Sequence, residues 1–452
     1  MIGPARSAAV RALMAVASGA ADLPTALAAS RASLADERDR ALATDIATGT
    51  LRWQRRLDYV IGVLARRPAA EIDPRLLLVL RISAYQLLYL DRVPAPAVVD
   101  DAVDLARAAH RSRGAGFVNA VLRSLVRQRK HLPLPSPPDG SDRAALAEYL
   151  GIIWSHPTWL VARWLERHGR EHTEQWLAFN NARPSMTLRV NPRRSTREAL
   201  MASLSNEDVE VAPTPFAPDG LIVVSGLPSP KDADGRFIVQ DEASQLVSCM
   251  VGVRPGETVL DLCAAPGGKA TALAADLDGR GSLVACDVRP RRLALLRDTV
   301  RQSGLGHVLV CHVSPAGDLP FHPVFDRVLV DAPCSGLGTI RRDPDIRWRR
   351  SADEFAGLAA RQRHLLDRAA AVVAPGGRLV YATCSSEPDE NEDVVEAFLA
   401  THPDFYRLDL RAEVPAALAP LIDPRGDFRT LPFAHGLEAF FAAALVRRPA
   451  QP

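Results

Sequence analysis

The feature that most constrains the fold is an alternation in the second half of the chain. From about residue 237 onward, short apolar runs alternate with stretches of helical periodicity. The strand candidates are ETVLDLC, SLVACD, HVLVCHV, DRVLVDAP and GRLVYATC, and helical patterns near 269–277, 290–303, 353–373 and 387–400 separate them. This alternation predicts a mostly parallel, doubly wound α/β sheet of Rossmann type, in which ligands bind at the carboxyl ends of the strands.

The rest of the chain predicts a multidomain protein. Apolar residues recur at spacings of three and four through residues 5–130, as in LLLVLRISAYQLLYL, so we expect an all-α domain at 1–130. The segment HLPLPSPPDGSD, residues 131–142, has the composition of a linker. Residues 143–236 predict helices and then a small α+β subdomain with strands at TLRVN and LIVV, and residues 237–452 hold the predicted α/β core.

Charge and cysteine usage narrow the function classes. The formal net charge of the 452 residues is only +2, so any surface that binds nucleic acid must be local. There is no run of about 18 apolar residues, and Arg11 interrupts the apolar stretch near the N-terminus, so we expect a cytoplasmic protein without a signal peptide or membrane span. The six cysteines form no CxxC pair, and we expect no metal site.

A glycine-containing loop follows the first predicted strand of the sheet. In CAAPGGKA, residues 263–270, Pro266 restricts one backbone angle, while Gly267 and Gly268 permit a tight turn and the close approach of a ligand. An ordinary strand-to-helix turn is the alternative. Asp287 ends the next strand, where a carboxylate can accept hydrogen bonds from ribose hydroxyls. The two features together favour a nucleoside cofactor, and the lack of GxGxxG argues against a dehydrogenase.

Two cysteines directly follow later strands, Cys334 in DAPCSG and Cys384 in ATCSSEPDENE. Core packing is the alternative for each, but two such cysteines beside a nucleoside loop favour a reaction centre. The pattern Ser-Glu-Pro at 386–388 indicates a helix start, whose macrodipole would favour a thiolate at Cys384. Thiolate addition at carbon 6 of a pyrimidine makes carbon 5 nucleophilic. An acid such as Asp331 at ring nitrogen 3 would ease this addition, and a second thiol would assist release of the product.

Four segments carry a resemblance to a known family. LDLCAAPGGKA, VLVDAPCSGLGTIRRDPDIRW, YATCSSEPDENE and FIVQDEASQLV (237–247) resemble the RNA 5-methylcytosine methyltransferases of the RsmB/Sun/Nop2 family. The resemblance implies an S-adenosylmethionine-dependent methyltransferase with Cys384 as nucleophile, Cys334 promoting product release, and Asp331 in contact with the target cytosine. The implied cofactor-binding residues are Cys263, Ala264, Ala265, Pro266, Gly267, Gly268, Lys269, Asp287, His312 and Asp331.

The chain departs from the family pattern at two places. His312 stands after the third strand, where the family usually carries an acidic residue near the cofactor adenine. Before the last strand the chain reads EAFF, residues 438–441, where the family tends to read DGFF. The first departure concerns the cofactor site, and the second is expected to be a tolerated structural change.

The first half of the chain carries a narrower resemblance. DRALATDIATGTLRWQRRLD, VLRISAYQLLYLDRVPAPAVVDDAVDLA and GFVNAVLRSL resemble a NusB-like RNA-binding domain, and LRVN at 188–191 resembles the start of the family's RRM-like subdomain. A NusB-like domain joined to this catalytic region implies methylation of small-subunit (16S) rRNA. The alternatives are a tRNA or 23S rRNA 5-methylcytosine methyltransferase, and an inactive RNA-binding module of ribosome assembly.

Two stretches are candidate contacts for the RNA partner. The first lies within residues 105–130, which hold basic residues and no acid: Arg107, Arg111, Arg113, Arg123, Arg127, Arg129 and Lys130. The second is RRDPDIRWRR at 341–350, with Trp348 available for stacking, whereas the four tryptophans between 154 and 176 are expected in the core. We expect an unpaired or flipped cytosine as target, because an A-form helix hides its carbons. We expect a monomer without DNA or membrane partners.

Overall fold

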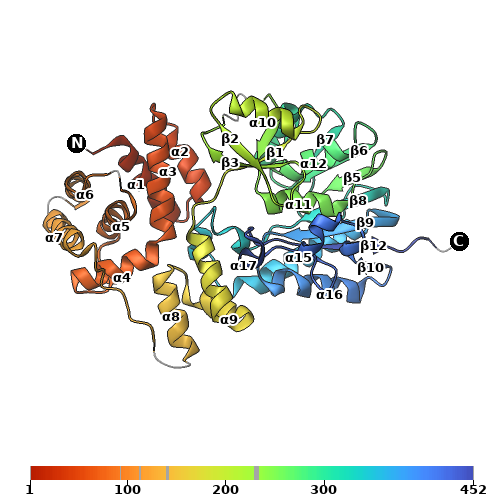
Figure 1. Cartoon of the computed structure of the whole chain (residues 1–452). Coiled ribbons are helices and arrows are strands. Elements are labelled where there is room, and N and C mark those ends of the chain that lie inside the picture. The colour runs from red at the N-terminus through yellow and green to blue at the C-terminus, as the bar shows by residue number, and fades with distance from the viewer. Residues whose placement is uncertain (1, 92, 111–112, 139–141, 229–233, 451–452) are drawn as a thin grey trace. The chain divides into compact units, whose positions relative to one another are not determined.

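The computed structural model describes residues 2–91, 93–110, 113–138, 142–228 and 234–450. The chain forms two compact units, the first made of Met1–Ala182 with Ile340–Ala352, the second of Arg183–Thr339 with Asp353–Pro452. The helices of the first unit that precede Ala182 are red to yellow in Figure 1, and the strands found among the described residues all lie in the second unit. The predicted range 143–236 is divided between them, because its residues up to Ala182 belong to the first unit and those from Arg183 onward to the second.

The first unit is helical, which confirms the prediction for residues 5–130. Its helices include α1 (Pro4–Ala17), α2 (Leu23–Arg31), α3 (Glu37–Arg52), α4 (Gln54–Ala65), α5 (Pro74–Tyr89), α6 (Ala95–His110) and α7 (Arg113–Gln128), with a 3₁₀ turn η1 (Ala69–Glu71). Asp22 and Asp73 cap α2 and α5 by accepting hydrogen bonds from backbone N–H groups of the first turn. Helix α5 is apolar on most sides and forms the centre of a cluster with α4, α6 and α7.

Helices α8 (Arg143–Ile153) and α9 (Thr158–Asn181) also belong to this unit, as does the short α14 (Ile346–Arg349) from the segment Ile340–Ala352. The rings of Trp164 and Trp176 are fully buried and stack with centroids 4.6 Å apart, as expected for core residues. Trp154 and Trp159 are only half-buried. The part of the chain that the structure describes contains no helix long and apolar enough to cross a membrane.

The second unit begins with a ferredoxin-like α+β subdomain. It contains β1 (Thr187–Val190), α10 (Arg197–Ser205), β2 (Glu210–Pro213), β3 (Gly220–Ser225) and β4 (Phe237–Val239), and the strands form an antiparallel sheet in the order β2-β3-β1-β4. Leu188 and Val190 of β1 pack with Leu200 and Leu204 of α10. The predicted strands at TLRVN and LIVV are therefore confirmed.

The larger sheet has the order β10-β12-β9-β8-β5-β6-β7. Its parallel part consists of β5 (Thr258–Asp261), β6 (Ser282–Asp287), β7 (Val308–His312), β8 (Phe325–Asp331) and β9 (Val373–Thr383). Antiparallel strands β10 (Phe405–Leu408) and β12 (Phe441–Arg447) extend one edge, and the short β11 (Phe428–Arg429) pairs with β12. The five strands expected from the apolar runs are confirmed.

Helices cover both faces of this sheet, as in a doubly wound fold. On one face α11 (Glu242–Val251), α12 (Gly268–Asp276) and α13 (Pro290–Ser303) pack against residues such as Val259; on the other α15 (Glu354–Ala370) and α16 (Glu392–Thr401) pack against residues such as Leu260. Shorter elements are η2 (Leu337–Thr339), η3 (Pro388–Glu390), η4 (Leu410–Ala412), η5 (Ala416–Leu421) and α17 (Pro432–His435). The parallel strands all end at one edge, which positions the site.

Candidate active site

The two cysteines that follow β8 and β9 lie together. Their Sγ atoms are 3.3 Å apart, and both residues are half-buried. Strands β8 and β9 are parallel neighbours, and the Gly338 N–H after the first cysteine donates to the carbonyl oxygen of Cys384 at 2.9 Å. The structure therefore brings Cys334 and Cys384 into one centre at the carboxyl edge of the sheet, as parallel pairing of their strands requires.

The environment of Cys334 favours its protonated form. The hydrogen bond between the two thiols, together with burial, raises the pKa of Cys334 well above its usual range. A thiol in this state holds its proton at neutral pH and can donate it during a reaction.

The expected helix start behind Cys384 is wrong. Residues 388–390 form only the 3₁₀ turn η3, and α16 begins at Glu392, after Asn391 leaves helical geometry with φ −114° and ψ −98°. The polar side chains of this stretch bond to one another: Asn391 Nδ2 donates to the Ser385 carbonyl at 3.0 Å, and Thr383 Oγ1 donates to Asn391 Oδ1 at 2.5 Å. The macrodipole of α16 therefore does not act on Cys384, since its effect is confined to the first turn.

A lysine supplies the positive charge instead. Lys269 Nζ, at the start of α12, donates to Asp331 Oδ2 at the end of β8 over 2.7 Å. Burial favours the neutral amine, but Asp331 and the sulfur of Cys384 outweigh it and raise the pKa of Lys269. The ammonium group of Lys269 thus lies within electrostatic reach of the Cys384 sulfur. The sequence predicted Lys269 only as a cofactor ligand.

The loop at 263–269 and Asp287 form a second group at the same edge. Gly267 has φ +113°, and a Cβ atom there would lie 3.0 Å from Leu296, so the turn requires glycine. Asp287 is buried, and its Oδ1 accepts the backbone N–H of Arg289 at 2.9 Å. Arg292, which the sequence did not predict, bonds to the carbonyl of Ala265 at 2.6 Å and lies 3.6 Å from Asp287. Arg292 thus connects the loop at 263–269 to the carboxylate of Asp287.

Asp261 is a residue of this edge that the sequence analysis missed. It ends β5 just before the loop and is fully buried, and neither carboxylate oxygen has a hydrogen-bond partner of normal geometry among the described residues. Burial and the nearby Asp331 raise the pKa of Asp261 to about 8. Its only signal in the sequence is an acid inside the apolar run TVLDLC. An orphaned buried carboxyl group is suited to a ligand that brings hydrogen-bond donors.

We expect Asp261→Asn to change the pH dependence of stability. The carboxyl group of the folded protein keeps its proton to about pH 8, whereas in the unfolded chain it ionises near the ordinary value of 3.8, so its contribution to stability is lost as pH rises between these values. Melting curves of ligand-free protein should show the variant gaining in melting temperature over the wild type from pH 5 to pH 8. The exposed Asp318→Asn is the control, and a difference that stays constant with pH would contradict the assignment.

His312 lies at the end of β7, opposite Asp287 in the register of the two strands. It is exposed, and its Nε2 lies 3.1 Å from the carbonyl oxygen of Val288. The residue is therefore at the predicted edge, but its role toward a cofactor stays a prediction.

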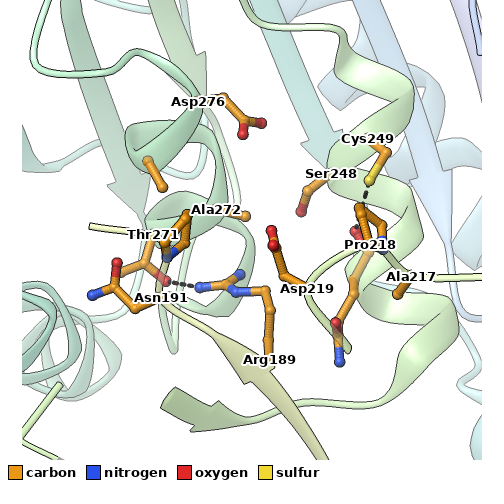
Figure 2. A pocket seen from close by; sticks show the side chains of 13 residues that line it. Arg189, Asn191, Ala217, Pro218, Asp219, Ser248, Cys249, Thr271, Ala272 and Asp276 are labelled. Carbon is orange, nitrogen blue, oxygen red and sulfur yellow. Dashed lines mark hydrogen bonds between the residues drawn. The ribbon is translucent and has the colours of Figure 1, made fainter. Parts of the chain in front are cut away.

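A small cavity of about 80 Å³ lies elsewhere in this unit, lined by residues of β1, α11 and α12 and by the loop before β3. Figure 2 shows Arg189 in it, with the carboxylates of Asp219 and Asp276 in the same hollow. The buried guanidinium of Arg189 donates to Thr271 Oγ1 at 2.6 Å and to the carbonyl of Gly268. None of the predicted site residues lines this cavity. Arg189 instead connects β1 to the loop at 263–269 and to α12 through these hydrogen bonds.

The segment 341–350 does not offer a stacking surface, contrary to the prediction. Within the first unit, Trp348 Nε1 donates to the Leu51 carbonyl at 2.7 Å, and the ring packs against an apolar cluster. Arg347 is fully buried and donates to the carbonyl of Ser155 at 2.9 Å and to Asn181 Oδ1 at 3.0 Å. The side chains of Arg347 and Trp348 are therefore engaged in contacts within the unit, and the composition of the segment does not reveal these contacts.

The basic stretch at 105–130 is only partly described. Arg111 and the side chain of Arg113 lie outside the described residues. The remaining basic side chains are exposed: Arg107, Arg123, Arg127, Arg129 and Lys130. Arg107 pairs with Asp104 at 3.2 Å and Arg129 with Asp91 at 3.7 Å, so acids outside the stretch offset part of its charge.

Comparison with known proteins identifies the family. Residues 249–446 match the family described as 16S rRNA methyltransferase RsmB/F, residues 3–127 the NusB family, and residues 156–229 the ferredoxin-like domain of RsmF/B-like methyltransferases. The chain is 37% identical to ribosomal RNA small subunit methyltransferase B of Pseudomonas putida, over 98% of each chain. The chain belongs to the RsmB/F family. It is also 34% identical to a probable ribosomal RNA small subunit methyltransferase B of Bacillus subtilis, over 91% of each chain.

Two solved structures are similar to the chain. The crystal structure of PH0851 is similar with a TM-score of 0.80 and 28% identity, over 98% of this chain and 99% of that one. A methyltransferase homologue from Pyrococcus horikoshii has a TM-score of 0.56 and 27% identity, over 66% of this chain and 97% of that one. The protein is an S-adenosylmethionine-dependent methyltransferase with a NusB-like helical domain, a ferredoxin-like subdomain and an α/β core.

The residues at the sheet edge fit this cofactor. The turn at Gly267 and Gly268 lies at the N-terminus of α12, Asp287 ends β6, and neither carboxylate oxygen of Asp261 has a hydrogen-bond partner among the described residues. A helix N-terminus and carboxylates at strand ends are groups that bind a nucleoside with an anionic tail. Among the described residues, no three or more His, Cys, Asp or Glu side chains form a group that could hold a metal ion.

Proposed function

We propose that this RsmB/F protein forms 5-methylcytosine in small-subunit (16S) rRNA through a covalent adduct between Cys384 and carbon 6 of the base. The observation that supports this most strongly is the pair of thiols 3.3 Å apart, with the Lys269–Asp331 ion pair at the same edge of the sheet. A methyltransferase acting on a nucleophilic oxygen or nitrogen needs no thiol pair, whereas carbon 5 of cytosine must first be activated by addition.

The chain's own residues carry the proposed steps. Lys269 supports the Cys384 thiolate, which adds to carbon 6 of the base. Asp331 contacts the base, and a proton passes from the Lys269 ammonium group through Asp331 to ring nitrogen 3 as the new bond forms. S-adenosylmethionine, held by residues 263–269 with Asp287, His312 and Asp331, supplies the methyl group for carbon 5. The proton of carbon 5 then passes to water, and the electrons that it leaves form the double bond between carbons 5 and 6 as the bond from carbon 6 to sulfur breaks. Cys334, a neutral thiol beside Cys384, donates its proton to the departing sulfur, and ring nitrogen 3 returns its proton to the Lys269–Asp331 pair.

The substrate part of the proposal follows from the relatives and the domain composition. The similar proteins named above are ribosomal RNA small subunit methyltransferases, and the NusB match covers residues 3–127. The target carbon lies in the stack of a duplex, so the enzyme must act on an unpaired or flipped cytosine at a cost of a few kcal/mol. The exposed arginines of α7 are candidate phosphate contacts.

Bisulfite sequencing of total RNA from cells with and without the gene tests the proposal. We expect one or more protected cytosines in the small-subunit rRNA that lose protection in the deletion strain and regain it with the wild-type gene. Protection lost only in tRNA or large-subunit rRNA would overturn the substrate, and no lost cytosine protection would overturn the reaction. Restoration by the Cys384→Ala gene would contradict the role of the thiol.

A further inference from the structure

One buried acid at the cysteine centre has no part in the steps above. Glu390, the last residue of η3, is fully buried. Its Oε1 accepts the backbone N–H of Ser335 at 2.8 Å and the Gln362 side-chain amide at 3.0 Å, and its Oε2 accepts the Ser385 hydroxyl at 2.6 Å. A single carboxylate therefore bonds to the residue that follows each cysteine.

The loops are braced by other contacts around this carboxylate. The hydroxyl groups of Ser335 and Ser385 lie 3.1 Å apart, and the Tyr381 hydroxyl donates to the Glu390 backbone carbonyl at 2.5 Å. Movement of either cysteine loop would break hydrogen bonds to Glu390. The side chain is thus placed to fix the separation of the two sulfur atoms.

Packing and hydrogen bonding alone do not explain why a carboxylate, and not a neutral side chain, occupies this buried position. No Lys or Arg forms an ion pair with it in the part of the chain that the structure describes. Burial of an ionised carboxylate without a counter-charge is costly, and neutral hydrogen-bonding groups join two loops at lower cost. A fixed negative charge is useful where two chemically identical thiols must behave differently.

We propose that Glu390 is a positioning residue for methyl transfer, whose carboxylate holds the two cysteine loops together and whose charge divides the roles of the two thiols. This inference rests on the proposed function, because it assumes that Cys384 attacks and Cys334 assists release. The negative charge keeps the proton on Cys334, while the ammonium group of Lys269 favours the thiolate of Cys384.

The charged and titratable groups around the pair agree with this division. Beside the hydrogen bond to Cys384 and burial, Glu390 also contributes to the raised pKa of Cys334. Tyr381, a further titratable group that interacts with Cys334, has its own pKa raised by burial and is neutral. Asp331 is engaged with Lys269, whose pKa reflects attraction to both Asp331 and Cys384. The negative charge of Glu390 therefore acts on Cys334, and the positive charge of Lys269 lies within electrostatic reach of Cys384.

Thiol alkylation in the full-length protein without RNA tests the charge effect. Iodoacetamide rates at Cys334 and Cys384 are measured between pH 7 and pH 10 by quantitative mass spectrometry of their peptides. In Glu390→Gln, which keeps the size of the side chain, we expect Cys334 to react about tenfold faster at pH 8, since one pKa unit changes the thiolate fraction tenfold. The rate at Cys384 should change by less than about threefold. Equal changes at both thiols, or none, would overturn the charge effect.

A second variant tests the positioning effect, and it also provides a test of the proposal if Glu390→Gln does not fold. Glu390→Asp keeps the charge but shortens the reach to Ser335 and Ser385. We expect alkylation of Cys334 as in wild type, with a kcat for methylation at least about tenfold lower and unchanged KM values. Wild-type kcat in Glu390→Asp would overturn the proposal.

Glu392→Gln is the matched control, because Glu392 is two residues away and pairs with Arg429 rather than with either cysteine loop. It should leave both alkylation rates unchanged. The alkylation rates are measured without any substrate, so they test the role of Glu390 alone. The proposed function is tested separately, because it fails if the wild-type protein forms no 5-methylcytosine.

Discussion

In the Cys334→Ala variant we expect a covalent complex between protein and RNA that withstands denaturing electrophoresis. The methyl group is transferred, but the sulfur of Cys384 is not released at a normal rate, because the neutral thiol 3.3 Å away is missing. The complex should need both RNA and S-adenosylmethionine, and nuclease treatment should reduce it to protein carrying a short RNA fragment.

The Cys384→Ala variant should form no such complex and should lose at least about 10³-fold in methylation rate, since loss of a covalent nucleophile costs more than this in well-studied enzymes. Cys311→Ala is the control for cysteine removal, because Cys311 is a half-buried residue of β7 outside the thiol pair. A complex trapped by Cys384→Ala and not by Cys334→Ala would exchange the two roles. A double variant that still forms the complex would exclude both cysteines.

In the Gly338→Ala variant we expect kcat to fall by roughly 10²-fold, because misplacement of reacting groups by about 1 Å has this effect. A Cβ atom at Gly338 would lie 1.9 Å from the backbone oxygen of Ala439 and 2.8 Å from that of Cys384. Backbone atoms cannot rotate away, so η2 must shift and carry Cys334 with it. The hydrogen bond from Gly338 to Cys384 would be lost as well.

Steady-state methylation of small-subunit rRNA and S-adenosylmethionine binding by calorimetry separate the effects in Gly338→Ala. Binding should remain within about threefold of wild type, since the loop at 263–269 is untouched. Gly357→Ala in α15, where the added methyl group meets no atom within 4 Å, is the control and should retain wild-type kcat. Wild-type kcat in Gly338→Ala would mean that the spacing of the two loops does not matter.

Much of the fold could be predicted from local patterns. Each strand of the parallel sheet is a short apolar run, and each intervening helix has its own periodicity, so residues close in sequence identify these elements. The two cysteines could be assigned to one edge because parallel strands end on the same side. The contact of the sulfur atoms and the Lys269–Asp331 pair depend on which strands are neighbours, and this order arises from packing along the whole chain.

Other parts of the site could not be predicted because polar side chains satisfy each other in ways that local propensity does not encode. The pattern Ser-Glu-Pro at 386–388 is typical of a helix start. However, Ser385 forms hydrogen bonds with Glu390 and Asn391, and α16 begins only at Glu392. Trp348 looked exposed in a basic segment, but its indole N–H is bonded within the helical unit. Asp261 was hidden within an apolar run that marks the strand itself.

Incubation of the purified protein with unmodified small-subunit rRNA and methyl-labelled S-adenosylmethionine, followed by digestion to nucleosides and mass spectrometry, tests the central claim most directly. The account predicts label in 5-methylcytidine, formed by the wild type and absent with Cys384→Ala. Label in any other nucleoside, or the same yield of 5-methylcytidine from Cys384→Ala, would contradict it.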